Sequence, residues 1–146
     1  MLIRLLMSIV LIFVISLEAH AQANFVGAVR VAMEAKILRG GKIIKASAGT
    51  MLEEKDTLVT EQTGSIGIVL KDNSVISLGP NSRFQISEFN FAPRENKLGL
   101  LGKLTKGTLE YISGKISKIA RDAAKFRTPF TTIAVRGTRL LIRVVE

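Results

Sequence analysis

The chain of 146 residues contains no cysteine and no tryptophan, and has only one histidine and one tyrosine. Without cysteine it forms no disulfide and offers no thiol nucleophile. The single histidine, His20, falls in an N-terminal segment of leader type, so a typical zinc site cannot form in the remainder. No group of Asp and Glu residues has the spacing of a calcium loop. We therefore predict no catalytic residue, no metal, no cofactor and no enzyme activity.

The N-terminal segment has the three parts of a secretory signal peptide. Arg4 precedes an apolar run at residues 5–17, and Ala19–Ala21 supplies a small-x-small cleavage site. The run is shorter than the roughly 20 apolar residues that a membrane span needs. We predict that residues 1–21 are a cleaved signal peptide and that residues 22–146 form one exported domain. An uncleaved anchor in the inner membrane is the alternative.

Acidic residues are few in the C-terminal part, where the positive charge is concentrated. Residues 22–93 hold 8 Lys and Arg against 7 Asp and Glu, whereas residues 94–146 hold 12 against 4. Nucleic acid is the usual partner of such a basic surface, but an exported chain rarely meets it, so we predict no nucleic-acid partner. Anionic lipid, acidic polysaccharide and an acidic protein remain as candidates. A solvated basic surface without a specific partner is the alternative.

Short alternating stretches separated by turn sequences run through the chain after residue 24. The clearest is a hairpin in which apolar residues alternate along 66–70, a KDNS turn follows at 71–74, and the pattern returns along 75–78. Gly-Gly within 39–42 and the GPNS sequence at 79–82 mark two further turns. This spacing predicts an all-β fold, a single sandwich- or roll-like domain of short antiparallel strands.

One stretch departs from the strand pattern and predicts a short helix near residues 115–125. Its apolar residues recur at helical spacing, with Lys115, Lys118 and Arg121 between them. These three cations are candidate contacts for an anionic partner. The other interpretation is that the helix covers an edge of the sheet and its cations are only solvated.

The stretch at 126–138 is predicted to organise the fold around a strand with one buried face. Pro129, which has no N–H to donate, should stand at the start of this strand. The pattern then breaks at Gly137, where a bulge or corner with positive φ would shift the phase. That shift predicts an inward face for Leu140, Ile142 and Val144, with Arg139 and Arg143 outward.

Arg136 is the most prominent single side chain of this stretch. Its five donors favour a structural role, in which it ties the corner at 136–138 to backbone carbonyls, to Asp56 or to Asp72. The alternative is a contact with an anionic partner.

The sequence T-P-x-x-x-I-A-V-R-G-T, from Thr128 to Thr138, resembles the closing signature of the FecR domain, named for a regulator of ferric citrate transport. Upstream segments resemble the same family in the expected order, at residues 49–50, 56–60, 64–65, 70–74, 78–82 and 106–109. The resemblance covers roughly residues 25–145. It marks as motif residues Asp56, Asp72, Thr128, Pro129, Arg136, Gly137 and Thr138.

The resemblance implies a periplasmic sensing module that receives a signal from an outer-membrane receptor and relays it, through a membrane helix, to a sigma factor. Only four residues precede the apolar run of this chain, so we do not expect a complete regulator of that kind. We predict instead a free exported binding module, periplasmic or secreted, with an envelope protein as its partner. A structural or carbohydrate-associated envelope protein is the alternative, which the scarcity of aromatic residues disfavours. The oligomeric state does not follow from the sequence.

Overall fold

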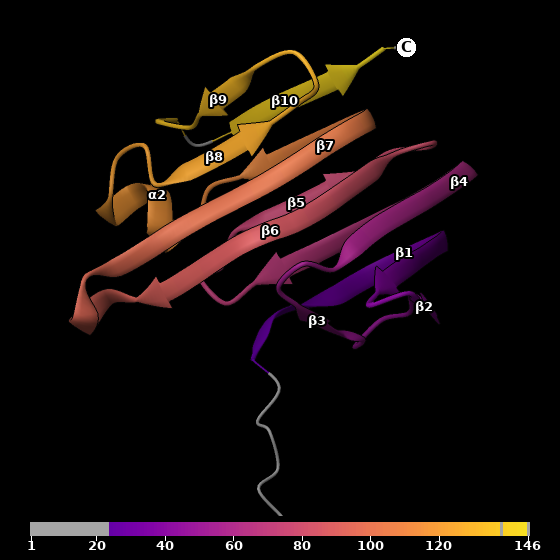
Figure 1. Cartoon of the computed structure of the whole chain (residues 1–146), viewed down its shortest axis with the longest axis horizontal. Helices are drawn as coiled ribbons and strands as arrows, with labels where there is room; N and C mark the ends of the chain where they lie inside the picture. Colours follow the sequence, from indigo (N-terminus) through magenta and orange to yellow (C-terminus); the bar gives the residue numbers. More distant parts are fainter. Residues whose placement is uncertain (1–23, 138, 146) are drawn as a thin grey trace, which may run out of the picture.

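The structure, a computed structural model, describes residues 24–137 and 139–145, and its strands belong to one ten-stranded sheet (Figure 1). In chain order the elements are β1 (Phe25–Arg39), β2 (Lys42–Lys45), β3 (Met51–Glu53), β4 (Thr57–Leu70), β5 (Val75–Leu78), β6 (Arg83–Ala92), the 3-10 turn η2 (Pro93–Glu95), β7 (Lys97–Ile112), α2 (Lys115–Ile119), β8 (Ala124–Arg127), β9 (Thr132–Ala134) and β10 (Arg139–Val144). The sheet follows the order β2-β1-β4-β5-β7-β8-β9. Off this path, β3 pairs with β1, β6 with β4 and β7, and β10 with β7. The predicted all-β class is confirmed.

Two long strands, β4 and β7, each change partner part-way along their length. Residues 57–59 of β4 and the 97–106 part of β7 pair with β6. Residues 66–69 of β4 and residues 109–112 of β7 pair with β5. Since β5 lies behind β6 in Figure 1, the sheet turns over along these two strands and makes two layers. The fold is therefore a roll made from one continuous sheet.

The turn-over in β7 occurs at Gly107, and glycine is required there for two reasons. Its φ is +92°, a left-handed backbone that side chains disfavour. A Cβ at this position would also lie 2.1 Å from the Ser82 Oγ and 2.4 Å from the Ser82 Cα. The close approach of β7 to the turn before β6 thus depends on the missing side chain.

The core lies between the two layers and is filled by alternate residues of the strands. Its fully buried members include Ile37, Leu52, Leu58, Ile68, Ile76, Phe84, Ile86, Leu104, Leu109, Tyr111, Ile116 and Phe126. Three aromatic rings meet inside it, because Phe126 lies 4.8 Å from Tyr111 and 6.3 Å from Phe84 between ring centroids. Burying each large apolar side chain stabilises the fold by roughly 1.5–3 kcal/mol, so the domain needs no disulfide.

The turn chemistry of the sequence identified the hairpins correctly. β1 and β2 join through Gly40 and Gly41 with φ of +53° and +80°, as the Gly-Gly pair predicts. β4 and β5 join through the turn at 71–74, in which Asn73 has a φ of +65°. The phase shift in the last strand is also confirmed, since Ile142 is buried while Arg139 and Arg143 are exposed.

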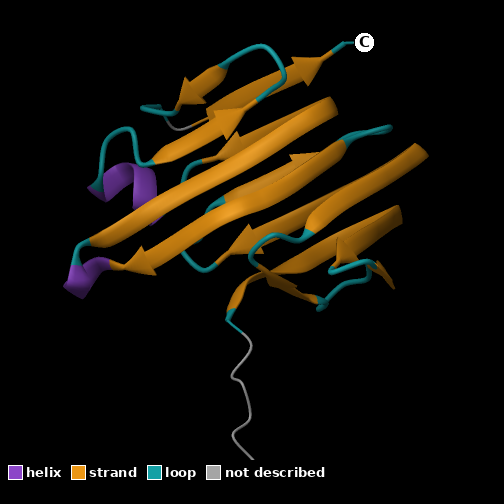
Figure 2. Ribbon diagram, viewed as in Figure 1, coloured by secondary structure: helices purple, strands orange, loops and turns teal. Residues whose placement is uncertain are grey.

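The expectation of antiparallel strands alone is wrong at one place, because β8 runs parallel to β7. Its register pairs Leu100 with Ala124 and Lys103 with Arg127. A parallel neighbour cannot be reached by a tight turn, and the excursion at 113–123 makes the crossover (Figure 2). The helix within it, α2, spans only Lys115–Ile119, shorter than the stretch to residue 125 that helical spacing indicates.

None of the helices in the described part of the chain is long and apolar enough to cross a membrane. The predicted signal peptide, residues 1–21, lies outside the described residues. So does Thr138, the last residue of the predicted corner.

Candidate functional site

Asp56 is a buried carboxylate that joins the end of β1 to the turn between β3 and β4. Only 1% of Asp56 is exposed, and Arg39 donates two hydrogen bonds to it, Nε to Oδ1 at 2.8 Å and Nη2 to Oδ2 at 2.7 Å. The backbone N–H of Glu53 donates to the same carboxylate at 2.8 Å. The hydrogen bond to Asp56 raises the pKa of Arg39 above its usual value. This carboxylate is therefore fully engaged within the fold.

Asp72 is also buried, and it ties the β4–β5 turn to the beginning of α2. The N–H and hydroxyl of Ser74 donate to Oδ1 at 3.1 and 2.6 Å, and the N–H of Ile116 donates to Oδ2 at 3.2 Å. The N–H of Lys115 donates to the Asp72 carbonyl at 2.8 Å. A Cβ on Gly114 would lie 2.3 Å from that carbonyl oxygen, so the approach requires glycine. The geometry assigns Asp72 to positioning the crossover that leads to β8.

Tyr111 and Ser117 place two hydroxyls near this buried carboxylate. Among the described residues, neither hydroxyl makes a hydrogen bond of normal geometry. Burial raises the pKa of Tyr111 above its usual value, and the negative charge of Asp72 adds to the rise. The Ser117 hydroxyl lowers the pKa of Tyr111 and so offsets part of this rise. Burial therefore favours a neutral phenol inside the core.

Thr128 and Pro129 lie in the tight turn between β8 and β9. The N–H groups of Phe130 and Thr131 donate to the Thr128 hydroxyl at 3.2 and 3.1 Å, and the Thr128 N–H donates to the Thr131 carbonyl at 2.8 Å. The prediction that Pro129 begins the strand is wrong, because β9 begins at Thr132. A proline fits this turn since its fixed φ suits the position after the first turn residue.

Arg136 makes an exposed ion pair, and its expected structural partners are wrong. Its Nε donates to Asp122 Oδ1 at 2.7 Å and its Nη2 donates to Asp122 Oδ2 at 3.0 Å. Asp56 and Asp72 are occupied by the contacts described above. Arg136 lowers the pKa of Asp122 below its usual value, chiefly through this hydrogen bond. The pair links the crossover to the segment after β9.

Gly137 does not have the conformation that the sequence indicates. It is absent from the glycines with positive φ, and a Cβ there would have no atom of the described residues within 4 Å. Its carbonyl accepts a hydrogen bond from the Ser113 hydroxyl at 3.0 Å. The phase shift before β10 therefore does not depend on a strained glycine at position 137.

The three cations predicted to contact an anionic partner are all exposed. Lys115 and Lys118 lie on α2, and Arg121 lies in the turn that follows it. Ile116 on the opposite side of the helix is buried, so α2 covers the core while its cations face solvent. Arg121 also acts electrostatically on its neighbour Asp122, the partner of Arg136.

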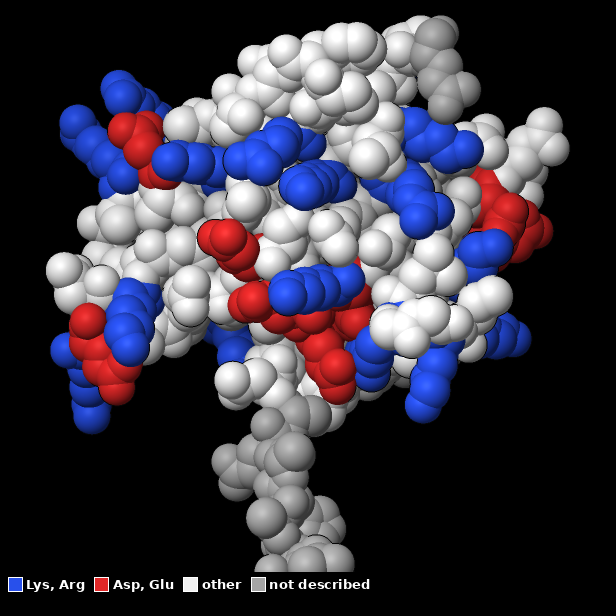
Figure 3. All heavy atoms as spheres, viewed as in Figure 1, with Lys and Arg blue, Asp and Glu red and all other residues white. Residues whose placement is uncertain are grey.

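A second group of cations, which the sequence analysis did not single out, lies on the outer face of β6, β7 and β8. Arg83, Lys103 and Arg127 project outward, next to the buried core residues Phe84, Leu104 and Phe126. Figure 3 shows Lys and Arg gathered in a band along β7 and β8, with most acidic side chains of this face below it. Their alternation with buried neighbours is the sequence signal that could have placed these residues on the outer face. Their proximity depends on cross-strand register, which the sequence does not reveal.

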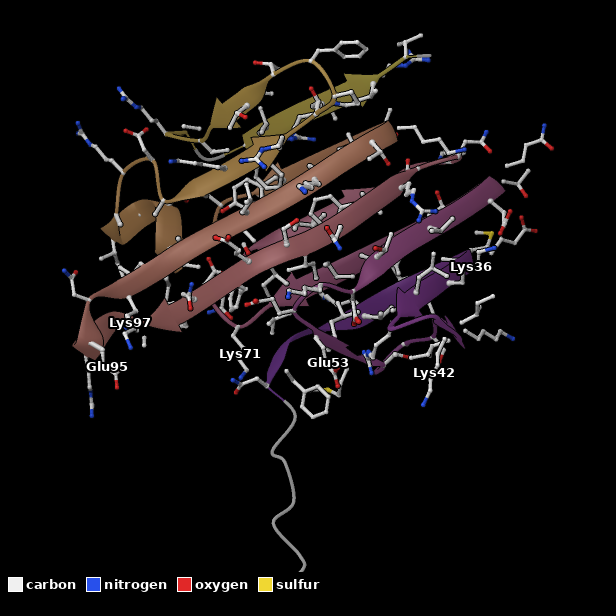
Figure 4. The ribbon with its side chains drawn as sticks, viewed as in Figure 1. Lys36, Lys42, Glu53, Lys71, Glu95 and Lys97 are labelled. Carbon is white, nitrogen blue, oxygen red and sulfur yellow. The ribbon has the colours of Figure 1, made fainter. Side chains whose placement is uncertain are left out.

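Other ion pairs lie away from this band (Figure 4). Glu95 and Lys97 pair at 3.5 Å at the tip of the β6–β7 hairpin, and Lys36 pairs with Glu61 at 3.2 Å near β2. Within the described residues, no three His, Asp or Glu side chains come together in a way that could hold a metal ion.

The profile of a protein family described as FecR protein matches residues 56–146 of the chain. The match includes both buried carboxylates, the crossover and the closing stretch at 128–138. No curated protein and no solved structure matches the chain significantly.

Proposed function

Since the chain belongs to the FecR protein family, we propose that it is an exported binding module that docks to a protein of the cell envelope and takes part in envelope signalling. The family is one of signalling and regulatory proteins. The family match over residues 56–146 carries this proposal. The site geometry supports it, because the buried carboxylates are engaged within the fold, whereas the outward cations are available to a partner.

The distribution of aromatic side chains favours a protein partner over a carbohydrate. Sugar-binding surfaces stack rings on exposed aromatic residues, whereas Phe84, Phe89, Tyr111 and Phe126 are buried here. In the described part of the chain, Phe130 is the aromatic residue that is mostly exposed, at 81%. A structural or carbohydrate-associated role is therefore the second candidate and is decided by the binding experiment below.

Export is the first testable part of the proposal. The small-x-small site at Ala19–Ala21 predicts a mature protein that begins at Gln22 and is released into the periplasm or medium. Intact-mass measurement of the chain recovered from its native host tests this. A full-length species retained in the inner membrane would support the anchored alternative.

Partner binding is the second part. The mature domain, carrying a photoreactive residue on its outer face, should cross-link in living cells to one envelope protein. That protein, once purified, should bind the domain saturably with a fixed stoichiometry. Saturable binding to purified envelope polysaccharide, with none to any cross-linked protein, would instead support the carbohydrate-associated role.

A further inference from the structure

The outer face of the roll carries a row of cations on consecutive strands. Register places Gln85 of β6 beside Lys103 of β7, and Lys103 beside Arg127 of β8. Arg83 lies two residues from Gln85 on the same face of β6, and Thr57 of β4 pairs with Gln85 on the other side. Neighbouring strands are about 4.8 Å apart, so three positive charges share a small area of a rigid surface.

These three cations lack acidic partners. No ion pair between described residues involves Arg83, Lys103 or Arg127, although both cations and acids elsewhere on the chain do pair. Like charges on adjacent strands repel one another and reduce stability. Neutral polar groups nearby are already engaged, since the Thr105 hydroxyl donates to the Arg83 carbonyl at 3.3 Å and the Gln85 amide donates to the Lys55 carbonyl at 3.3 Å. The side-chain N–H groups of Arg83, Lys103 and Arg127 are therefore available to donate to a ligand.

Two adjoining hollows lie among these side chains. One of about 280 Å³ is lined by Thr57, Arg83, Gln85, Lys103 and Thr105. The other, of about 290 Å³, is lined by Lys103, Leu104, Thr105, Arg127, Thr128 and Pro129. Lys103 and Thr105 line both, so the hollows form one shallow groove across β4, β6, β7 and β8. We call this surface the cationic groove.

We propose that the cationic groove binds an extended acidic peptide segment of a protein partner. This inference rests on the proposed function, because it names the surface and the chemistry through which that function would act. Three strand spacings give the groove a length of about 14 Å, which matches about four residues of an extended chain at roughly 3.3 Å each. Arginine and lysine side chains accept such a segment through charge-assisted hydrogen bonds to its carboxylates.

The shape and the apolar end of the groove favour a peptide over the other anions. A hollow admits a single chain, whereas a flat bilayer meets a face through its protruding side chains. Pro129 lines the second hollow, and exposed Phe130 follows in the same turn. That end fits an apolar side chain of the ligand next to its acidic residues. A polysaccharide would find no stacked pair of exposed rings among the described residues near the groove.

The test uses the mature chain and fluorescent peptides of about ten residues. One peptide alternates Asp and Glu with apolar residues, and its control carries Asn and Gln at the same positions. The variant Lys103→Gln with Arg127→Gln removes two charges from the groove. Its matched control, Lys42→Gln with Lys45→Gln, removes two charges from β2, at the opposite end of the strand order (Figure 4).

We expect the acidic peptide to bind wild type and the β2 control equally, and the groove variant about tenfold more weakly. The amide peptide should bind none of them measurably. The melting temperature of the groove variant should equal or exceed that of wild type, because repulsion is removed. A fall in melting temperature would assign the two cations to the fold and overturn the inference.

Three further outcomes would overturn the inference. One is equal binding of the acidic peptide to both variants. The second is stronger binding to polyuronate, and the third is stronger binding to phosphatidylglycerol vesicles. If the cross-linked envelope protein binds wild type and the groove variant equally, the groove is wrong but the proposed function stands. If no envelope protein binds although the acidic peptide discriminates between the variants, the proposed function fails by itself.

Discussion

At the scale of single residues, Gly107 and Gly137 show that the fold requires glycine at one position and tolerates a side chain at another. Gly107 has a φ of +92° and touches Ser82, whereas Gly137 has open space around it. We expect Gly107→Ala to destabilise the domain by about 2–4 kcal/mol, because both backbone strain and overlap with Ser82 are added. Gly137→Ala should change stability by no more than about 0.5 kcal/mol. Denaturant melts measure both, and equal midpoints would contradict the turn-over of β7 at Gly107.

Tyr111 predicts how stability depends on alkaline pH. Burial raises the pKa of its phenol in the folded state, while the unfolded chain ionises near its ordinary value of about 10. The unfolded state therefore holds fewer protons above that pH, and stability falls as pH rises from about 10 through the folded-state pKa. Tyr111→Phe should flatten this decline and, at neutral pH, change stability by less than about 1 kcal/mol, since the lost hydroxyl has no full hydrogen bond.

The measurement is direct because Tyr111 is the only tyrosine and the chain has no tryptophan. Tyrosinate absorbance reports its ionisation in the folded protein, and urea melts at neutral and alkaline pH report stability. An alkaline decline of the same size in wild type and Tyr111→Phe would show that other groups cause it.

The site residues were predictable only as members of a sequence motif. Asp56 and Asp72 were marked by the FecR resemblance, but their burial follows from partners distant in sequence, Arg39 and Ile116. Arg136 was expected to bind backbone carbonyls or one of these carboxylates, and it pairs with Asp122. A local pattern identifies polar residues in turns, and it does not say which charged side chains the fold brings together.

At the scale of elements, the Arg39–Asp56 pair holds the end of β1 against the turn that precedes β4. Arg39→Met would leave the Asp56 carboxylate, 1% exposed, with only the Glu53 N–H as a donor. Because the arginine is itself partly exposed, we expect a loss of about 2–3 kcal/mol, below the full range for a buried pair. In the Arg39→Met background, Asp56→Asn should lower the free energy of unfolding by less than it does in the wild-type protein. Equilibrium melts of the two single variants and the double variant give the coupling, and strictly additive losses would contradict it.

Elements were predicted well where neighbouring residues determine them and poorly where contacts between distant residues do. The KDNS and Gly-Gly turns fix hairpins within a few residues, and the structure confirms both. The parallel pairing of β8 with β7 depends on how Ile116 anchors α2 to the core and on the Asp72 contacts at the start of α2. Since those contacts join residues 44 positions apart, no window of the sequence contains them.

At the scale of the whole molecule, two groups of outward cations contribute to the formal net charge of +9. One is the cationic groove, and the other is Lys115, Lys118 and Arg121 around α2. The groove cations line hollows that a ligand can enter, whereas the α2 cations line neither of these two hollows. Charges within a shaped site act on the bound ligand, and charges beyond it act mainly on its approach.

Substitution of the cations in the two groups should therefore have effects on binding kinetics that depend differently on salt. Lys115→Glu with Lys118→Glu and Arg121→Glu should slow association of the acidic peptide at low salt, and the effect should vanish once the Debye length falls below about 8 Å. The groove variant should instead speed dissociation at every salt concentration, because it removes direct contacts. Stopped-flow association and dissociation rates across ionic strength measure both. If the α2 variant abolishes binding at high salt while the groove variant leaves it intact, the docking surface is α2 and its turn, because screened charges act only through direct contact.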